Sequence, residues 1–247
     1  MVVGALLALV PAGAARAAYQ EVEVVRGGVV TGTVRFTGVR PRLDPVVIGR
    51  PREVCGERAP AEALVVGPDG GVAGAVVRLE GVARGKRPAG EVVLDSTGCR
   101  FVPHVVATMV GGRVRVRNGD PVVHSPYGLL DGAPVFHVAL PSPGQVVDVG
   151  RRLTRPGVVR VLCDAHPHMG AWLVVHDSPY VAVSDERGVY RIEAVPPGAY
   201  RVTLWHEGWR ARGTDRTGRP VYDGPRLETR AVTVGPGETV TLDFELR

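Results

Sequence analysis

The chain has 247 residues, long enough for one large or two small domains with a buried core, and 45% of them are hydrophobic and 22% charged, as in ordinary globular proteins. Its 33 glycines and 21 prolines favour short strands and turns and argue against long helices. The net charge of +5 comes almost wholly from scattered arginines, since Lys86 is the only lysine, and this argues against a nucleic-acid-binding protein.

The N-terminus has the pattern of an export signal. Residues 2–10 are apolar but too short to span a bilayer, and Ala15-Arg16-Ala17 fits a small-x-small cleavage site. We therefore expect residues 1–17 to be a signal peptide and the protein to be periplasmic or secreted. The basic residues that normally precede such a core are absent, which leaves open an earlier start codon or a buried element instead. No later stretch is apolar enough to cross a membrane.

Residues 18–90 predict a β-rich module. Alternating polar and apolar residues at 28–36 and 75–80 indicate half-buried strands, and the sequence Pro-Asp-Gly-Gly at 68–71 indicates a turn. The polar, turn-rich stretch 85–90 is a plausible domain boundary. No catalytic constellation is visible in this part of the chain.

A loop with three sulfur and imidazole side chains follows further along. The strand expected at 159–162 delivers Cys163, and His166 and Met169 follow at intervals of three before the strand expected at 172–175. Cys-x2-His-x2-Met supplies two strong ligands and one weak, soft one, which suits a metal that accepts sulfur and imidazole together. Taken singly, such residues are commonly part of a core, so the conjunction carries the inference.

His124 is the best candidate for a further ligand. The alternating strand expected at 114–117 ends in the turn residues of 118–121, and His124 follows just beyond that turn. Two histidines, a cysteine and a weakly held methionine make the trigonal-plus-axial arrangement of a blue-copper site. Zinc is the main competing metal, but closed zinc sites seldom use a thioether, so Met169 argues against it.

The two loops and their strands resemble the cupredoxins, in particular the amicyanin and plastocyanin types. The resemblance rests on 118–124, on the Cys-x2-His-x2-Met loop and on the strand Phe101-Val102-Pro103. It covers residues 92–177 and implies a Greek-key β-sandwich that binds one type 1 copper ion. By that resemblance the equatorial copper ligands are His124, Cys163 and His166, and the axial ligand is Met169. It also implies that His166 reaches the surface within an apolar patch.

Three further side chains are candidates for positions beside the ligands: His104, Asn118 and Ser125. Ser125 stands where many cupredoxins carry Asn, and its hydroxyl can still donate a hydrogen bond, so the difference concerns redox tuning. His104 is either a neighbour or extra ligand of the metal or an ordinary strand histidine. His168 is expected to be solvated on the exposed loop.

The resemblance also indicates how the three cysteines are used. If Cys163 binds copper in an exported protein, Cys55 and Cys99 remain, and we expect them to form a disulfide. The alternative is two independent buried thiols.

Residues 178–247 resemble the carboxypeptidase regulatory-like, transthyretin-type β-sandwich. The resemblance rests on Asp-x-x-Gly-x-Tyr at 185–190 and Pro-Pro-Gly-x-Tyr at 196–200, and 74–79 looks like the opening strand of a similar unit. Such modules act as spacers or docking surfaces, and nothing here implies peptidase chemistry.

The sequence therefore predicts an all-β protein. Its expected parts are the signal peptide (1–17), the β-rich module (18–90), the cupredoxin-like copper domain (91–177) and the regulatory-like sandwich (178–247). The predicted function is one-electron transfer to a redox partner protein, with arginines 151, 152 and 155 steering an acidic partner. Two alternatives stay open: a copper enzyme or copper-handling protein with an open axial position, and a secreted β-scaffold without metal. No Ser/His/Asp or paired-carboxylate constellation favours an enzyme.

Overall fold

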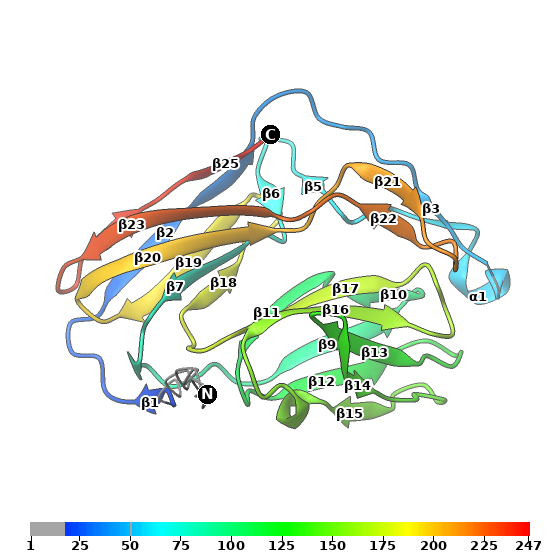
Figure 1. The fold of residues 1–247 in the computed structure, drawn as a ribbon, viewed down its shortest axis with the longest axis horizontal. Helices are drawn as coiled ribbons and strands as arrows, with labels where there is room; N and C mark the ends of the chain where they lie inside the picture. Colours follow the sequence, from blue (N-terminus) through cyan, green and yellow to red (C-terminus); the bar gives the residue numbers. More distant parts are fainter. Residues whose placement is uncertain (1–17, 50) are drawn as a thin grey trace, which may run out of the picture.

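The computed structural model describes residues 18–49 and 51–247, and nearly all of its regular structure is β (Figure 1). Over these ranges the helical elements are the short helix α1 (Arg52–Cys55) and the 3-10 turn η1 (Gly150–Arg152). The expected all-β class is confirmed. The predicted signal peptide, residues 1–17, lies outside the described residues. None of the described helices has the length and apolar character needed to cross a bilayer.

The middle of the chain forms one β-sandwich, the mid-chain sandwich. One sheet has the strand order β10-β9-β12-β15 and the other the order β11-β17-β16-β13-β14. The strand bounds are β9 (Val92–Thr97), β10 (Arg100–Val102), β11 (Val105–Met109), β12 (Val114–Asn118), β13 (Pro126–Leu130), β14 (Ala133–His137), β15 (Val146–Asp148), β16 (Gly157–Cys163) and β17 (Gly170–His176). The non-consecutive neighbours require connections that cross between the sheets, as in a Greek-key sandwich.

Alternation along the strands builds the core of this sandwich. In β12, Val114 and Val116 are buried while Arg115 and Arg117 point outward, because successive side chains of a strand face opposite sides. Phe101 is buried in the same core. The apolar faces of the two sheets thus form a single packed layer beneath the loops that carry the candidate ligands.

The two ends of the chain together form the second sandwich, the terminal sandwich. Its sheets have the orders β18-β7-β20-β23 and β19-β2-β24, with β25 also paired to β2. The bounds are β2 (Gly28–Phe36), β7 (Val76–Glu80), β18 (Val181–Val183), β19 (Val189–Val195), β20 (Gly198–His206), β23 (Arg226–Val234), β24 (Thr239–Thr241) and β25 (Phe244–Leu246). Strands from residues 18–90 and from 178–247 therefore share both sheets and one hydrophobic core. In sequence, the mid-chain sandwich is inserted between β7 and β18.

Short strand pairs decorate the two sandwiches: β1 (Gln20–Glu21) with β8 (Arg84–Gly85), β3 (Val46–Val47) with β4 (Arg58–Ala59), β5 (Val65–Val66) with β6 (Val72–Ala73), and β21 (Ala211–Thr214) with β22 (Pro220–Tyr222). The two sandwiches touch through a small apolar cluster in which Val76 and Trp205 meet Val105 and Val174. In Figure 1, the β21–β22 hairpin and α1 extend over one end of the mid-chain sandwich.

Candidate metal centre

Strand pairing brings the two predicted ligand loops to the same end of the mid-chain sandwich. β13 and β16 are antiparallel, and Pro126 is paired directly with Cys163. The loop that precedes β13 and the loop that follows β16 therefore leave the sheet side by side. A backbone hydrogen bond from the Asp164 N–H to the Ser125 carbonyl joins them at 3.1 Å.

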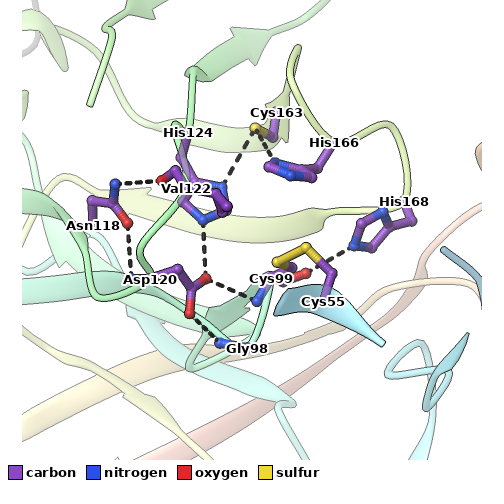
Figure 2. The surroundings of a disulfide bond; sticks show 10 residues. All are labelled: Cys55, Gly98, Cys99, Asn118, Asp120, Val122, His124, Cys163, His166 and His168. Carbon is purple, nitrogen blue, oxygen red and sulfur yellow. Dashed lines mark hydrogen bonds and ion pairs between the residues drawn. A yellow bond between two sulfur atoms is a disulfide. The ribbon is translucent and has the colours of Figure 1, made fainter. Parts of the chain in front are cut away.

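Three predicted ligands converge there, as Figure 2 shows. The Cys163 Sγ lies 4.0 Å from His124 Nδ1 and 3.9 Å from His166 Nδ1. All three donor atoms lie within 4.8 Å of one another, and all three residues are buried. An ion about 2.3 Å from sulfur and about 2.0 Å from nitrogen, with the bonds about 120° apart, would hold those atoms about 3.7 Å apart. The donor set and its spacing thus fit one ion.

The protonation states suit metal binding. Burial lowers the pKa of His124, and burial together with the neighbouring His124 lowers the pKa of His166 to about 4. Both imidazoles are therefore neutral near pH 7 and can offer a nitrogen lone pair. Burial raises the pKa of the Cys163 thiol, so this group loses its proton when a metal binds rather than before. The Ser125 backbone N–H approaches the Cys163 sulfur at 3.3 Å.

Met169 lies at the end of the same loop. It is fully buried, and its backbone N–H donates to the His166 carbonyl at 3.0 Å, which closes the turn between the two residues. Its side chain belongs to the same buried cluster as Cys163. Met169 is thus held in the buried core of the mid-chain sandwich rather than in solvent.

Asp120 is a functional candidate that sequence reasoning missed. Its Oδ2 accepts a hydrogen bond from His124 Nε2 at 2.9 Å (Figure 2). The same carboxylate accepts the backbone N–H groups of Gly98 at 2.7 Å and Cys99 at 2.9 Å. Because Nε2 is engaged as a donor, Nδ1 keeps the lone pair that faces Cys163. The sequence pattern marks Asp120 only as a turn residue, and its spacing of four from His124 is the one signal that points to the pairing.

Asn118 holds the loop that carries this pair. Its side-chain amide donates to the carbonyls of Val122, at 2.8 Å, and Leu140, at 2.9 Å, and its Oδ1 accepts the Asp120 N–H at 2.9 Å. Asn118 therefore supports the candidate site through the backbone rather than by touching a donor atom.

The other candidate neighbours lie further out. The Ser125 hydroxyl pairs with His137 Nε2 at 3.0 Å, so only its backbone N–H reaches the Cys163 sulfur. His104 contacts the Gly170 carbonyl and the Glu207 carboxylate, and no described contact joins it to the three donors. His168, expected to be solvated, instead bonds the Cys99 carbonyl at 2.9 Å.

The disulfide predicted between Cys55 and Cys99 is present and ties α1 to the turn between β9 and β10. It lies against the candidate site, since its two sulfurs and a His166 ring nitrogen are all within 4.8 Å of one another. From the other side, the Arg219 guanidinium donates to the carbonyls of Pro167, at 2.8 Å, and Cys163, at 3.3 Å.

The disulfide on one side of the site and the Arg219 contacts with its loop bear on one expectation, which proves wrong. The cupredoxin resemblance implied that His166 reaches the surface, but only 3% of its area is exposed. The disulfide of α1 lies against the His166 ring, and Arg219, in the turn between β21 and β22, bonds the carbonyls of the same loop. Neither α1 nor this turn belongs to the stretch that resembles cupredoxins. Arginines 151, 152 and 155, which were expected to steer a partner, precede β16, whose seven residues separate them from Cys163 by about 20 Å.

Comparison with known proteins gives one family match. A carboxypeptidase regulatory-like domain is matched at residues 157–247. This match begins in β16, so it includes two strands that pair within the mid-chain sandwich. A search of curated proteins finds no match.

Several solved structures resemble part of the chain. A Cu-containing nitrite reductase from Thermus scotoductus SA-01 is 22% identical over 39% of this chain and 24% of its own, with a TM-score of 0.30. Amicyanin from Paracoccus versutus is 17% identical over 36% of this chain and 85% of its own, with a TM-score of 0.30. A purple cupredoxin from Nitrosopumilus maritimus is 22% identical over 35% of this chain and 99% of its own, with a TM-score of 0.29. The chain thus spans about a quarter of the reductase.

Proposed function

We propose that the chain is an exported type 1 copper protein that carries single electrons by Cu(II)/Cu(I) cycling. The observation that carries the proposal is the meeting of one thiol and two neutral imidazoles, from two separate loops, around a space that fits one ion. Sulfur and imidazole together are a donor set suited to copper, and a weak thioether nearby completes the blue-copper pattern.

Each residue has a defined part in this function. His124 and His166 offer their Nδ1 lone pairs, and Cys163 gives up its thiol proton and provides a thiolate. Met169 is the weak fourth ligand that adjusts the reduction potential. Copper bound there supplies a one-electron couple. Burial of the donors keeps water away, so little solvent reorganises when the charge changes.

Export and a protein partner belong to the same proposal. The disulfide between Cys55 and Cys99 suits an oxidising compartment, the periplasm or the outside of the cell. A redox partner protein must approach the end of the sandwich that holds Cys163, because electron transfer needs a short path. The exposed Arg151 and Arg152 lie at the other end of β16, so they would attract an acidic partner at long range without forming its docking surface.

A copper titration of the full chain tests the proposal. We expect one copper per chain, an intense thiolate-to-copper absorption at about 600 nm, and loss of this band in Cys163→Ser. His137→Asn is the matched control, since His137 lies beside the loops but outside the donor set. A copper complex without this band, or a band that survives in Cys163→Ser, would refute the assignment.

The same preparation separates the alternatives. A rapid spectral change on adding nitrite or azide would favour a copper enzyme with an open position. If Cys163→Ala changes neither the metal content nor the fold, the non-metal scaffold is favoured. Preferential zinc uptake with four-coordinate geometry would identify the site as a zinc site.

A further inference from the structure

A cavity of about 480 Å³ lies between the two sandwiches, separate from the donor cluster. One wall comes from β16 and β17, and the other from β20 and the β21–β22 hairpin, so neither sandwich forms it alone. Its volume falls in the range of about 300–1,000 Å³ that is usual for small-molecule sites. Neither the family match nor the sequence resemblances assign a ligand to it.

Aromatic rings form the apolar part of the wall. Trp172 of β17 and Trp205 of β20 meet edge to face, with ring centroids 5.5 Å apart, and both line the cavity. Val158 and Leu162 of β16 extend the same apolar surface. Such a wall favours a flat ring over a flexible or strongly hydrated ligand.

Arg160 brings an unused positive charge into this cavity. Its side chain is partly buried, and its guanidinium lies 6.0 Å from the centre of the Trp172 ring. Across the described part of the chain, no hydrogen bond or ion pair engages this guanidinium. Burial and the nearby Arg219 lower the pKa of Arg160, yet an arginine starts so far above neutrality that it stays charged.

The other charged groups of the cavity already have partners. Arg78 pairs with Glu80 at 2.8 Å, Arg100 with Glu62 at 3.2 Å, Arg219 with the Pro167 carbonyl at 2.8 Å, Arg226 holds Asp223 at 2.7 Å, and Glu207 pairs with His104. Arg160 therefore carries the charge that has no hydrogen-bonded or ion-paired partner among the described residues, although Asp215 and Glu207 act on it at longer range. A charge withdrawn from water in this way is stabilised by an anion that reaches it.

We propose that this cavity binds a small planar molecule with one carboxylate, its ring against Trp172 and Trp205 and its carboxylate on Arg160. The guanidinium fork matches a carboxylate with two parallel hydrogen bonds. Glu62 and Glu207 line the same cavity, so a ligand with a second negative charge is disfavoured. The site does not require the proposed copper, although Met169 and Gly170 line it and place the ligand beside the metal loop.

The test is calorimetric titration of the full, metal-free chain with 2-naphthoate. We expect one saturable site, no comparable binding of the neutral 2-naphthylmethanol, and a weakening of about tenfold or more in Arg160→Gln. Arg155→Gln is the matched control, because Arg155 is an exposed arginine that does not line the cavity. It should bind 2-naphthoate as the unaltered chain does.

The proposal is overturned if 2-naphthoate does not bind, if the neutral analogue binds equally well, or if Arg160→Gln binds unchanged. Should Arg160→Gln fail to fold, Arg160→Lys keeps the charge but loses the fork, and a smaller loss of affinity is then expected. Since no copper is present, the result is independent of the proposed electron transfer. Absence of a copper band and absence of naphthoate binding are therefore separate failures.

Discussion

Removing the carboxylate charge of Asp120 should have an effect on the candidate centre whose size can be calculated from the structure. In Asp120→Asn the negative charge next to His124 disappears while the side chain keeps its size. A carboxylate that accepts His124 Nε2 at 2.9 Å lies about 6–7 Å from an ion bound at Nδ1. At an effective dielectric constant of about 20, one unit of charge at that distance is worth about 2.5 kcal/mol.

The sign of the effect follows from the charges. The carboxylate stabilises Cu(II) more than Cu(I) because Cu(II) carries one more positive charge. Its removal should therefore raise the reduction potential, and about 2.5 kcal/mol corresponds to about 100 mV for one electron. Copper affinity should also fall by about 10–100-fold, since the hydrogen bond that orients the His124 ring is weakened. Potentiometric titration and metal competition measure the two quantities.

Asp164→Asn is the matched control for this prediction. Asp164 directly follows Cys163, but its side chain is 54% exposed and pairs with His137 at the surface. Solvent screens this charge, so the potential should move by much less than in Asp120→Asn. Equal shifts in the two variants, or a lowered potential in Asp120→Asn, would refute the reasoning.

Three further perturbations test other parts of the structure. Met169→Leu should keep copper and its thiolate band but raise the potential on the order of 100 mV, whereas Met109→Leu on β11 should leave the potential unchanged. Burial alone would lower the pKa of His104, but Glu207 and Glu62 outweigh it and hold the pKa above its usual range. The stabilisation from this charge is complete below about pH 6.5 and is lost as the pH rises through the elevated pKa. The free energy of unfolding, measured by denaturation at pH 6 and at pH 9, should show this decline. In His104→Gln the free energy of unfolding should be about 3 kcal/mol lower at pH 6, and its decline with pH should be smaller. An unchanged pH dependence in this variant would contradict the pairing. The double variant Cys55→Ser/Cys99→Ser opens a loop with a sequence separation of 44, which should cost about 4 kcal/mol of unfolding free energy in urea. Equal midpoints would exclude a stabilising cross-link.

Local pattern was enough to predict much of the site. Strand alternation indicated that β16 ends at Cys163, and three-residue spacing placed His166 and Met169 on one loop with it. His124 could be joined to them only as the residue past a strand-ending turn that completes a blue-copper donor set, because nothing in its own neighbourhood reveals which loop it faces. The pairing of Pro126 with Cys163 supplies that missing relation.

The environment of the site depended on contacts that no local pattern contains. Asp120 becomes a partner of His124 only because the Gly98 and Cys99 amides, from another turn, orient its carboxylate. His166 is buried by segments more than fifty residues away in sequence, as the contact of Arg219 with the Cys163 carbonyl shows, with its sequence separation of 56. The cavity at Arg160 likewise exists only where two sandwiches meet.

Taken by itself, the sequence determined the β class, the approximate course of several strands and the donor groups on each loop, since these follow from side-chain period and turn chemistry within a few residues. Tertiary structure decided that β2 and β7 complete the sheets of the C-terminal strands, that the two ligand loops share one end, and that the donors are covered. These outcomes depend on which apolar faces bury one another most completely, a property of the whole chain rather than of any segment.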